Sequence, residues 1–93
     1  MKKVEIIERH EGLSGWYATV LVDGVKYFVG IERGKRVRIA FKPRGENIGY
    51  WWNGLVRDAR GRDVWYGRVN KSNGVRGLLR FAGLLEQAPG EQA

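Results

Sequence analysis

The stretch that most constrains the fold runs from Ile48 to Val69 and reads IGYWWNGLVRDARGRDVWYGRV. It holds five of the eleven aromatic residues in a chain of 93 residues. At its centre, Asp58 favours the first position of a type I turn, and Gly61 can adopt the positive φ that follows such a turn. The stretch therefore predicts one β-hairpin, with a three-residue loop from Ala59 to Gly61.

Counting back from this turn predicts which side chains of the hairpin share a face. The all-apolar face, expected to lie inside, holds Trp51, Leu55, Trp65 and Val69. The other face, expected to be exposed, holds Tyr50, Trp52, Tyr66 and Arg68. Near the turn, Arg57 is expected opposite Asp63 and Val56 opposite Val64. The assignment depends on the register, because a slip of one residue would exchange the two faces of a strand.

A second hairpin is predicted by Asp23-Gly24, a two-residue turn signal between two apolar runs. Pairing Val22 with Val25 gives one face a core-like set of side chains: Trp16, Ala18, Val20, Tyr27, Val29 and Ile31. Phe28 is expected on the opposite face, beside basic residues. After this hairpin, Glu32-Arg33-Gly34 predicts a three-residue loop leading into a further strand over residues 35–41.

Two more elements complete the predicted fold. A first strand is expected from Lys3 to Arg9, where Val4 and two isoleucines are apolar. A C-terminal helix of about three turns is expected after residues 70–73, whose side chains can cap it. The apolar positions at helical spacing are Val75, Leu78, Leu79, Ala82 and Leu85.

Together these elements predict an α+β protein that is mostly β: a curved antiparallel sheet, or a partly closed barrel, of about six strands with one C-terminal helix. Residues 1–86 are expected to form a single small domain and residues 87–93 a flexible tail. From Tyr27 to Leu85 the order of elements resembles that of the Whirly, Pur-alpha and transcriptional-coactivator single-strand-binding domains. An OB-like barrel is the other expected architecture. The resemblance is one of element order, so it implies no site residues.

Basic charge is concentrated around the aromatic hairpin. The formal net charge is +7 and the isoelectric point is near 10.1. Residues 33–80 hold 13 Lys or Arg against three acidic residues, whereas the rest of the chain holds four basic and seven acidic residues. Such a charge distribution favours a polyanion as partner, and a role in solubility is the alternative.

The residue types that most catalysis requires are scarce. The chain has no cysteine, one histidine (His10) and two serines (Ser14 and Ser72), so neither a catalytic triad nor a zinc cluster fits. Asp58 and Asp63 are each expected opposite an arginine, and ion pairing explains them more simply than metal binding. We therefore expect no enzyme, no cofactor and no metal site.

The N-terminal residues bear on the cellular location. The sequence MKKVEIIERHEG has no apolar run after its lysines, so we expect no signal peptide. No window of the sequence approaches the length of a membrane span. We expect a soluble, cytoplasmic protein without a membrane partner.

Exposed aromatic rings among basic residues favour a non-catalytic protein that binds nucleic acid, with single-stranded DNA or RNA preferred and little sequence specificity. The residues expected to contact phosphates are Arg36, Arg38, Lys42, Arg44 and Arg68. The rings expected to stack on bases are Phe28, Tyr50, Trp52 and Tyr66. A variant of this hypothesis lays the sheet on duplex DNA and wedges side chains between base steps.

The alternative hypothesis belongs to a different class, a small protein-interaction or regulatory module, for example of viral origin. Its aromatic face would dock on a protein partner or form a homodimer, because Trp, Tyr and Arg are also the common hot-spot residues of protein interfaces. Tryptophan fluorescence in the presence of oligonucleotides distinguishes the two hypotheses.

Overall fold

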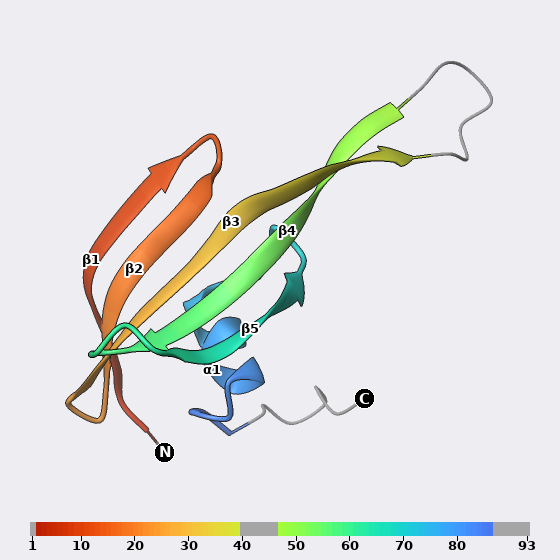
Figure 1. Ribbon diagram of the computed structural model, residues 1–93. Helices are drawn as coiled ribbons and strands as arrows, with labels where there is room; N and C mark the ends of the chain where they lie inside the picture. Colours follow the sequence, from red (N-terminus) through yellow and green to blue (C-terminus); the bar gives the residue numbers. More distant parts are fainter. Residues whose placement is uncertain (1, 40–46, 87–93) are drawn as a thin grey trace.

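One antiparallel sheet forms the frame of the molecule, and a short helix packs on one of its faces (Figure 1). The structure, a computed structural model, describes residues 2–39 and 47–86. The strands are β1 (Val4–Gly12), β2 (Gly15–Val22), β3 (Val25–Ile39), β4 (Asn47–Asp58) and β5 (Asp63–Val69). Helix α1 (Val75–Phe81) follows them. Each strand pairs with the next in the order β1-β2-β3-β4-β5.

The predicted class, a mostly β protein with an antiparallel sheet and a C-terminal helix, is confirmed. The described residues form five strands in one open sheet, so six strands and partial closure into a barrel are not confirmed. The predicted tail, residues 87–93, lies outside the described residues. No helix within the described ranges is long and apolar enough to cross a membrane.

The predicted loop at Glu32-Arg33-Gly34 is wrong, because β3 continues through it for 15 residues. Strand β4 pairs with β3 on both sides of this segment, Arg33 with Trp52 and Arg36 with Tyr50, and a register shift between them absorbs the difference in spacing. A glycine can lie in a turn or within a strand. At Gly34 the chain does not reverse, because pairing with β4 keeps β3 extended. The expected separate strand over residues 35–41 is therefore the end of β3 as far as Ile39, and residues 40–41 lie outside the described part.

The hairpin of β2 and β3 has the predicted turn and register. Asp23 and Gly24 adopt positive φ values of 50° and 82°, as a two-residue turn of this type requires. Val22 pairs with Val25, and the pairing continues without interruption to Trp16 and Ile31. The core face of this hairpin is therefore as predicted.

The hairpin of β4 and β5 has the predicted turn but a different register. The Asp58 backbone N–H donates to the Arg62 carbonyl at 2.9 Å, and Gly61 has a φ of 81°. Arg57 pairs with Asp63 as expected, but Val56 then pairs with Trp65. The extra residue in β5 is Val64, a bulge that shifts the remaining pairing by one residue.

The bulge makes half of the predicted face assignment wrong. Trp65 and Val69 do lie on the helix side, and Tyr66 and Arg68 do lie on the opposite side. In β4 the assignment is reversed: Trp52 pairs with Val69 and Val56 with Trp65, both on the helix side. Trp51 and Leu55 therefore lie on the face away from the helix.

The core lies between the sheet and α1. Its buried apolar side chains are Ala18, Val20, Val22, Val29, Ile31, Val56, Val75, Leu78 and Leu79. Two glycines, Gly54 of β4 and Gly67 of β5, pair across the strands below the helix. A Cβ atom on Gly54 would lie 2.6 Å from Leu78 Cδ2, and one on Gly67 would lie 2.8 Å from the Trp65 indole. The helix and the indole pack closely on the sheet because these two positions carry no side chain.

Helix α1 is shorter than predicted, seven residues where about three turns were expected. Gly83 has a φ of 76°, and its N–H donates to the Arg80 carbonyl while the Leu84 N–H donates to the Leu79 carbonyl. This is a Schellman motif, in which a left-handed glycine ends the helix. At the other end, the N-cap is Gly74 without a side-chain cap, whereas residues 70–73 were expected to cap the helix.

Candidate functional site

The face of the sheet opposite α1 has no covering element among the described residues, and we call it the open face (Figure 1). Successive side chains of a strand point to opposite faces. A residue that precedes or follows a helix-side residue in its strand therefore lies on the open face. The open-face residues that carry rings or charges include Glu5, Glu8, His10, Tyr17, Lys26, Phe28, Glu32, Trp51, Arg57, Asp63, Tyr66 and Arg68. Leu55 lies among them.

Trp51 and Arg68 form the closest contact between a ring and a cation in the described structure. The Arg68 guanidinium carbon lies 3.7 Å from the centroid of the Trp51 ring. Trp51 remains 40% exposed, and Tyr66 on the same face is 52% exposed. A cation over an indole is an attractive arrangement, and it holds both groups at the surface. The sequence analysis missed Trp51 because the predicted register placed it in the core.

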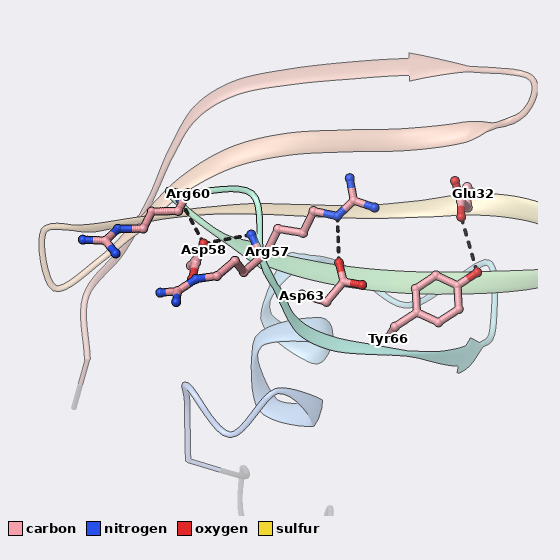
Figure 2. Close-up of polar contacts among 7 residues, drawn as sticks. Glu32, Arg57, Asp58, Arg60, Asp63 and Tyr66 are labelled. Carbon is pink, nitrogen blue, oxygen red and sulfur yellow. Dashed lines mark hydrogen bonds and ion pairs between the residues drawn. The ribbon is translucent and has the colours of Figure 1, made fainter.

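Tyr66 reaches from β5 across β4 towards Glu32 on β3 (Figure 2). Its hydroxyl donates a long hydrogen bond of 3.5 Å to Glu32 Oε1. Closer to the turn, Arg57 Nε donates to Asp63 Oδ1 at 2.9 Å, which confirms the predicted pair. These contacts orient the polar side chains of the open face while leaving them accessible to solvent.

The other side of the open face carries a second set of rings. His10 and Tyr17 stack with their ring centroids 4.9 Å apart and an angle of 27° between the ring planes. On β3, the Lys26 ammonium lies 5.4 Å from the centroid of the half-buried Phe28 ring. Flat rings and cations therefore occur on both sides of the open face.

Strands β3 and β4 project beyond the rest of the sheet as a two-stranded ribbon (Figure 1). The ribbon begins beyond the pair Arg33 and Trp52, because β2 starts opposite Glu32 and β5 ends opposite Trp52. It extends to the pair Ile39 and Asn47. In the sequence, residues 33–44 hold six Lys or Arg and no acidic residue. The ribbon therefore lies in the most basic segment of the chain and begins beside Trp51.

The predicted site residues are distributed over three regions. Phe28, Tyr66 and Arg68 lie on the open face, as expected. Three others occupy register positions within the ribbon: Arg36, Arg38 and Tyr50, where Arg36 pairs with Tyr50. Lys42 and Arg44 lie outside the described residues. The structure therefore brings Arg68 together with Trp51, and Tyr66 lies on the same face, two residues from Arg68 along β5.

The placement of Trp52 is a correction. It was expected among the exposed rings, but it is half-buried on the helix side and packs against the core. The Lys71 ammonium lies 4.9 Å from the centroid of its ring. The bulge at Val64 is the physical reason, because it changes the pairing of every β4 residue beyond Arg57. Trp51 takes the exposed position that the sequence analysis assigned to Trp52.

Asp58 organises the turn between β4 and β5 (Figure 2). Its Oδ1 accepts hydrogen bonds from the backbone N–H of Arg62 at 3.0 Å and of Arg60 at 2.9 Å, and its Oδ2 accepts one from Arg62 Nε at 3.0 Å. The Arg62 backbone N–H is the largest cause that lowers the pKa of this carboxyl below its ordinary value. The carboxylate therefore fixes the turn from which the register of the hairpin is set.

Comparison with known proteins finds no match for this chain among protein-family models, curated proteins or solved structures. The resemblance to single-strand-binding domains therefore remains one of element order. Within residues 2–39 and 47–86, no group of three or more His, Asp or Glu side chains is placed to hold a metal ion. The rings and charges of the open face are therefore the features that bear on its function.

Proposed function

We propose that the protein binds nucleic acid without catalysing a reaction, and that it prefers single strands and has little sequence specificity. The observation that carries this proposal is the contact of Arg68 with the exposed Trp51 ring, with the exposed Tyr66 on the same face, which no described element covers. Bases of a single strand expose their flat faces, and a base that stacks on an aromatic side chain contributes roughly 1–3 kcal/mol. Such a surface accepts any base, because every base has a flat face.

The phosphates of the strand are proposed to follow the ribbon. Arg36 and Arg38 occupy register positions along β3, and the sequence continues with Lys42 and Arg44. Lysines and arginines that neutralise phosphates release counterions, so binding weakens as the salt concentration rises. The ribbon starts next to Trp51, and Arg36 and Arg38 pair with Tyr50 and Ile48, in the register of Trp52. One strand is therefore proposed to pass from the open-face rings around the edge of the two-stranded ribbon to these basic residues.

Titration of the tryptophan fluorescence tests this proposal. An oligo-dT, an oligo-U and a DNA duplex are each titrated at two salt concentrations. The single strands should quench the fluorescence more strongly than the duplex, and the affinity should fall as salt rises. Absence of quenching by all three, at both salt concentrations, would contradict the proposal.

The contribution of charge is tested by replacing Arg36 with glutamine. The plot of log affinity against log salt concentration should become less steep by about 0.7, the value expected for one phosphate contact with a single strand. Arg76→Gln is the matched control, because Arg76 is an exposed residue of α1 that belongs neither to the ribbon nor to the open face. Equal slopes for the parent and both variants would remove the phosphate contacts from the proposal.

A protein-interaction module is the second candidate function, and one observation favours it. Acidic side chains also lie on the open face: Glu8, Glu32 and Asp63. Mixed charges among rings are typical of protein interfaces, where Trp, Tyr and Arg contribute most of the affinity. In that case Trp51→Ala would weaken a homodimer or a contact with a protein partner. Sedimentation of the parent and the variant over a range of concentrations would show the change.

A further inference from the structure

A groove of about 720 Å³ lies on the open face, and Gly30 is one of the residues that line it. Five residues from five strands form one row across the sheet: His10, Tyr17, Gly30, Leu55 and Tyr66, each paired with the next. The middle member has no side chain, so the row is interrupted between Tyr17 and Leu55. The groove exists because the central strand carries a glycine where its neighbours carry rings and an apolar chain.

The walls of the groove suit a flat ring. On one side the stacked pair of His10 and Tyr17 forms a wall, and Tyr17 is 61% exposed. On the other side lies Leu55, with Tyr66 beyond it. Phe28 lines the end nearest the turn between β2 and β3. A nucleobase needs an aromatic surface on which to stack and apolar contacts at its edges, and the groove offers both.

An acidic residue, Glu32, lines the end of the groove nearest the ribbon. The Tyr66 hydroxyl donates to its Oε1 at 3.5 Å. A carboxylate has about four acceptor positions, so one hydrogen bond leaves capacity for further donors. This acid is the last residue before a segment of 12 residues, 33–44, that holds six basic residues and no acid. A negative charge placed there disfavours phosphates and favours donors on the edge of a base.

We propose that the groove holds one unstacked guanine, with Tyr17 stacking on its ring and Glu32 accepting hydrogen bonds from its N1–H and its 2-amino group. This inference rests on the proposed function, and it adds a preference for one base at one position of an otherwise non-specific strand. Guanine places two adjacent donors on its Watson–Crick edge. Thymine and uracil place one N–H between two carbonyl oxygens, which a carboxylate disfavours. Adenine and cytosine offer one amino group.

The experiment compares three DNA 11-mers: oligo-dT, the same strand with guanine at its centre, and the same strand with hypoxanthine, which lacks the 2-amino group. Affinities are measured by fluorescence anisotropy for the parent, Glu32→Gln and Glu5→Gln. Glu5 is the matched control, because it is an exposed acid on β1 that pairs with Leu21, away from the groove.

The parent should bind the guanine strand at least about fivefold more tightly than oligo-dT, the lower end of the range for a two-donor contact to one base. The hypoxanthine strand should lie between them. Glu32→Gln should lose the preference while retaining affinity for oligo-dT, and Glu5→Gln should keep it. Equal binding of all three strands by the parent, or a preference that persists in Glu32→Gln, would overturn the assignment.

A second variant tests the stacking wall without disturbing the core. Gly30 is a poor choice, because a Cβ atom there would lie 2.9 Å from the Trp16 carbonyl oxygen. Tyr17→Ala removes an exposed ring, and it should lower the affinity for the guanine strand at least about fivefold more than that for oligo-dT. Equal losses for both strands would place the guanine elsewhere. Failure of the parent to bind any of the strands would overturn the proposed function too, whereas equal binding overturns only the guanine site.

Discussion

The two faces of the sheet both contain a glycine position among large side chains, and they use it differently. On the helix side, the pair of Gly54 and Gly67 is covered by the Trp65 indole and by Leu78. On the open face, Gly30 lies between Tyr17 and Leu55 with a groove above it. The backbone is closely packed at both places, because a Cβ atom on Gly30 would also lie 2.9 Å from the Trp16 carbonyl oxygen. The faces differ in what covers them: a helix and an indole on one, and a groove on the other.

The difference shows what distinguishes a core from a binding surface in a small sheet. No charged or polar residue is buried among the described residues, so the buried core on the helix side consists of apolar side chains. The open face combines rings of similar size with cations and acids, for example Trp51 with Arg68 and Tyr66 with Glu32. Aromatic content therefore does not mark the core in this protein. The rings of the two faces differ in burial: Trp52 is half-buried against the core although Lys71 lies over its ring, whereas Trp51 and Tyr66 are exposed.

The largest expected change in stability concerns two consecutive residues of β5, one on each face of the sheet. Trp65 packs on the helix side and stacks on Phe81 with ring centroids 5.3 Å apart, whereas Tyr66 lies on the open face. Trp65→Ala should lower the free energy of unfolding by about 3–5 kcal/mol, as the removal of a core aromatic does. Tyr66→Ala, the control, should change it by less than about 1 kcal/mol. Urea unfolding followed by circular dichroism measures both.

A reversed order of the two losses would mean that the helix side is not the core. Comparable large losses would mean that both faces are needed for stability, and the open face would then not be free to bind a ligand.

The glycine pair below the helix gives the next test. Gly54→Ala would place a methyl group 2.6 Å from Leu78 Cδ2 and 2.8 Å from Val69 Cγ1, so the side chains packed over this position would have to shift. Overpacking of this kind costs about 1–3 kcal/mol of stability. Gly12→Ala is the control, because nothing lies within 4 Å of a Cβ atom there. Equal melting temperatures for the two variants would show that α1 does not pack closely on β4.

The two hairpins show how far the sequence determines these faces. In the hairpin of β2 and β3, the turn at Asp23-Gly24 is followed by uninterrupted pairing, so the predicted faces are correct. In the hairpin of β4 and β5, the turn is also correct, but the bulge at Val64 shifts the strand beyond it. Valine is common in regular strands, so its residue type does not mark a bulge. The register could not be predicted past that point.

A signal for the correct assignment was present in the glycines. Gly54 and Gly67 on one face indicate a place where a bulky ring or a helix approaches closely, and that face is the core. Gly34 was interpreted as a turn residue, whereas a Cβ atom there would lie 3.1 Å from the Trp51 carbonyl oxygen and 2.5 Å from Asn53 Nδ2. Close approach of β4 explains this glycine. The sequence does not distinguish a turn glycine from a glycine required by the close approach of another strand, because the two differ only in whether the chain reverses.

Trp51 and Trp52 are consecutive residues on opposite faces, so they test the functional half of the comparison. Trp51→Ala should cost roughly 1–3 kcal/mol of affinity for oligo-dT, the range for one stacked base, with little change in melting temperature. Trp52→Ala should lower the melting temperature, because its half-buried ring packs against the core. Anisotropy titration and thermal unfolding of both variants measure the two effects. If Trp52→Ala alone lost affinity while remaining stable, the predicted register would be right and the structural assignment of the faces wrong.

The smallest expected effect concerns Asp58. Its turn lies next to the bulge at Val64, so it helps to set the face on which each β4 side chain lies. Hydrogen bonds, first that from the Arg62 backbone N–H, lower the pKa of its carboxyl below the ordinary value of 3.8. A lowered folded-state pKa means that the ionised carboxylate stabilises the folded state. This contribution is fully present above about pH 4, near the unfolded pKa. It is lost as the pH falls through the lower folded-state value.

The melting temperature of the parent should therefore decrease on acidification below this pH, and Asp58→Asn should show a smaller decrease because it has no carboxyl to protonate. Asp63→Asn is the control, since it removes an equal charge on the other side of the turn and leaves the Asp58 hydrogen bonds in place. Thermal unfolding of the three proteins over a series of acidic buffers measures the effect. An acid transition that is identical in the parent and in Asp58→Asn would show that this turn does not contribute to the pH dependence of folding.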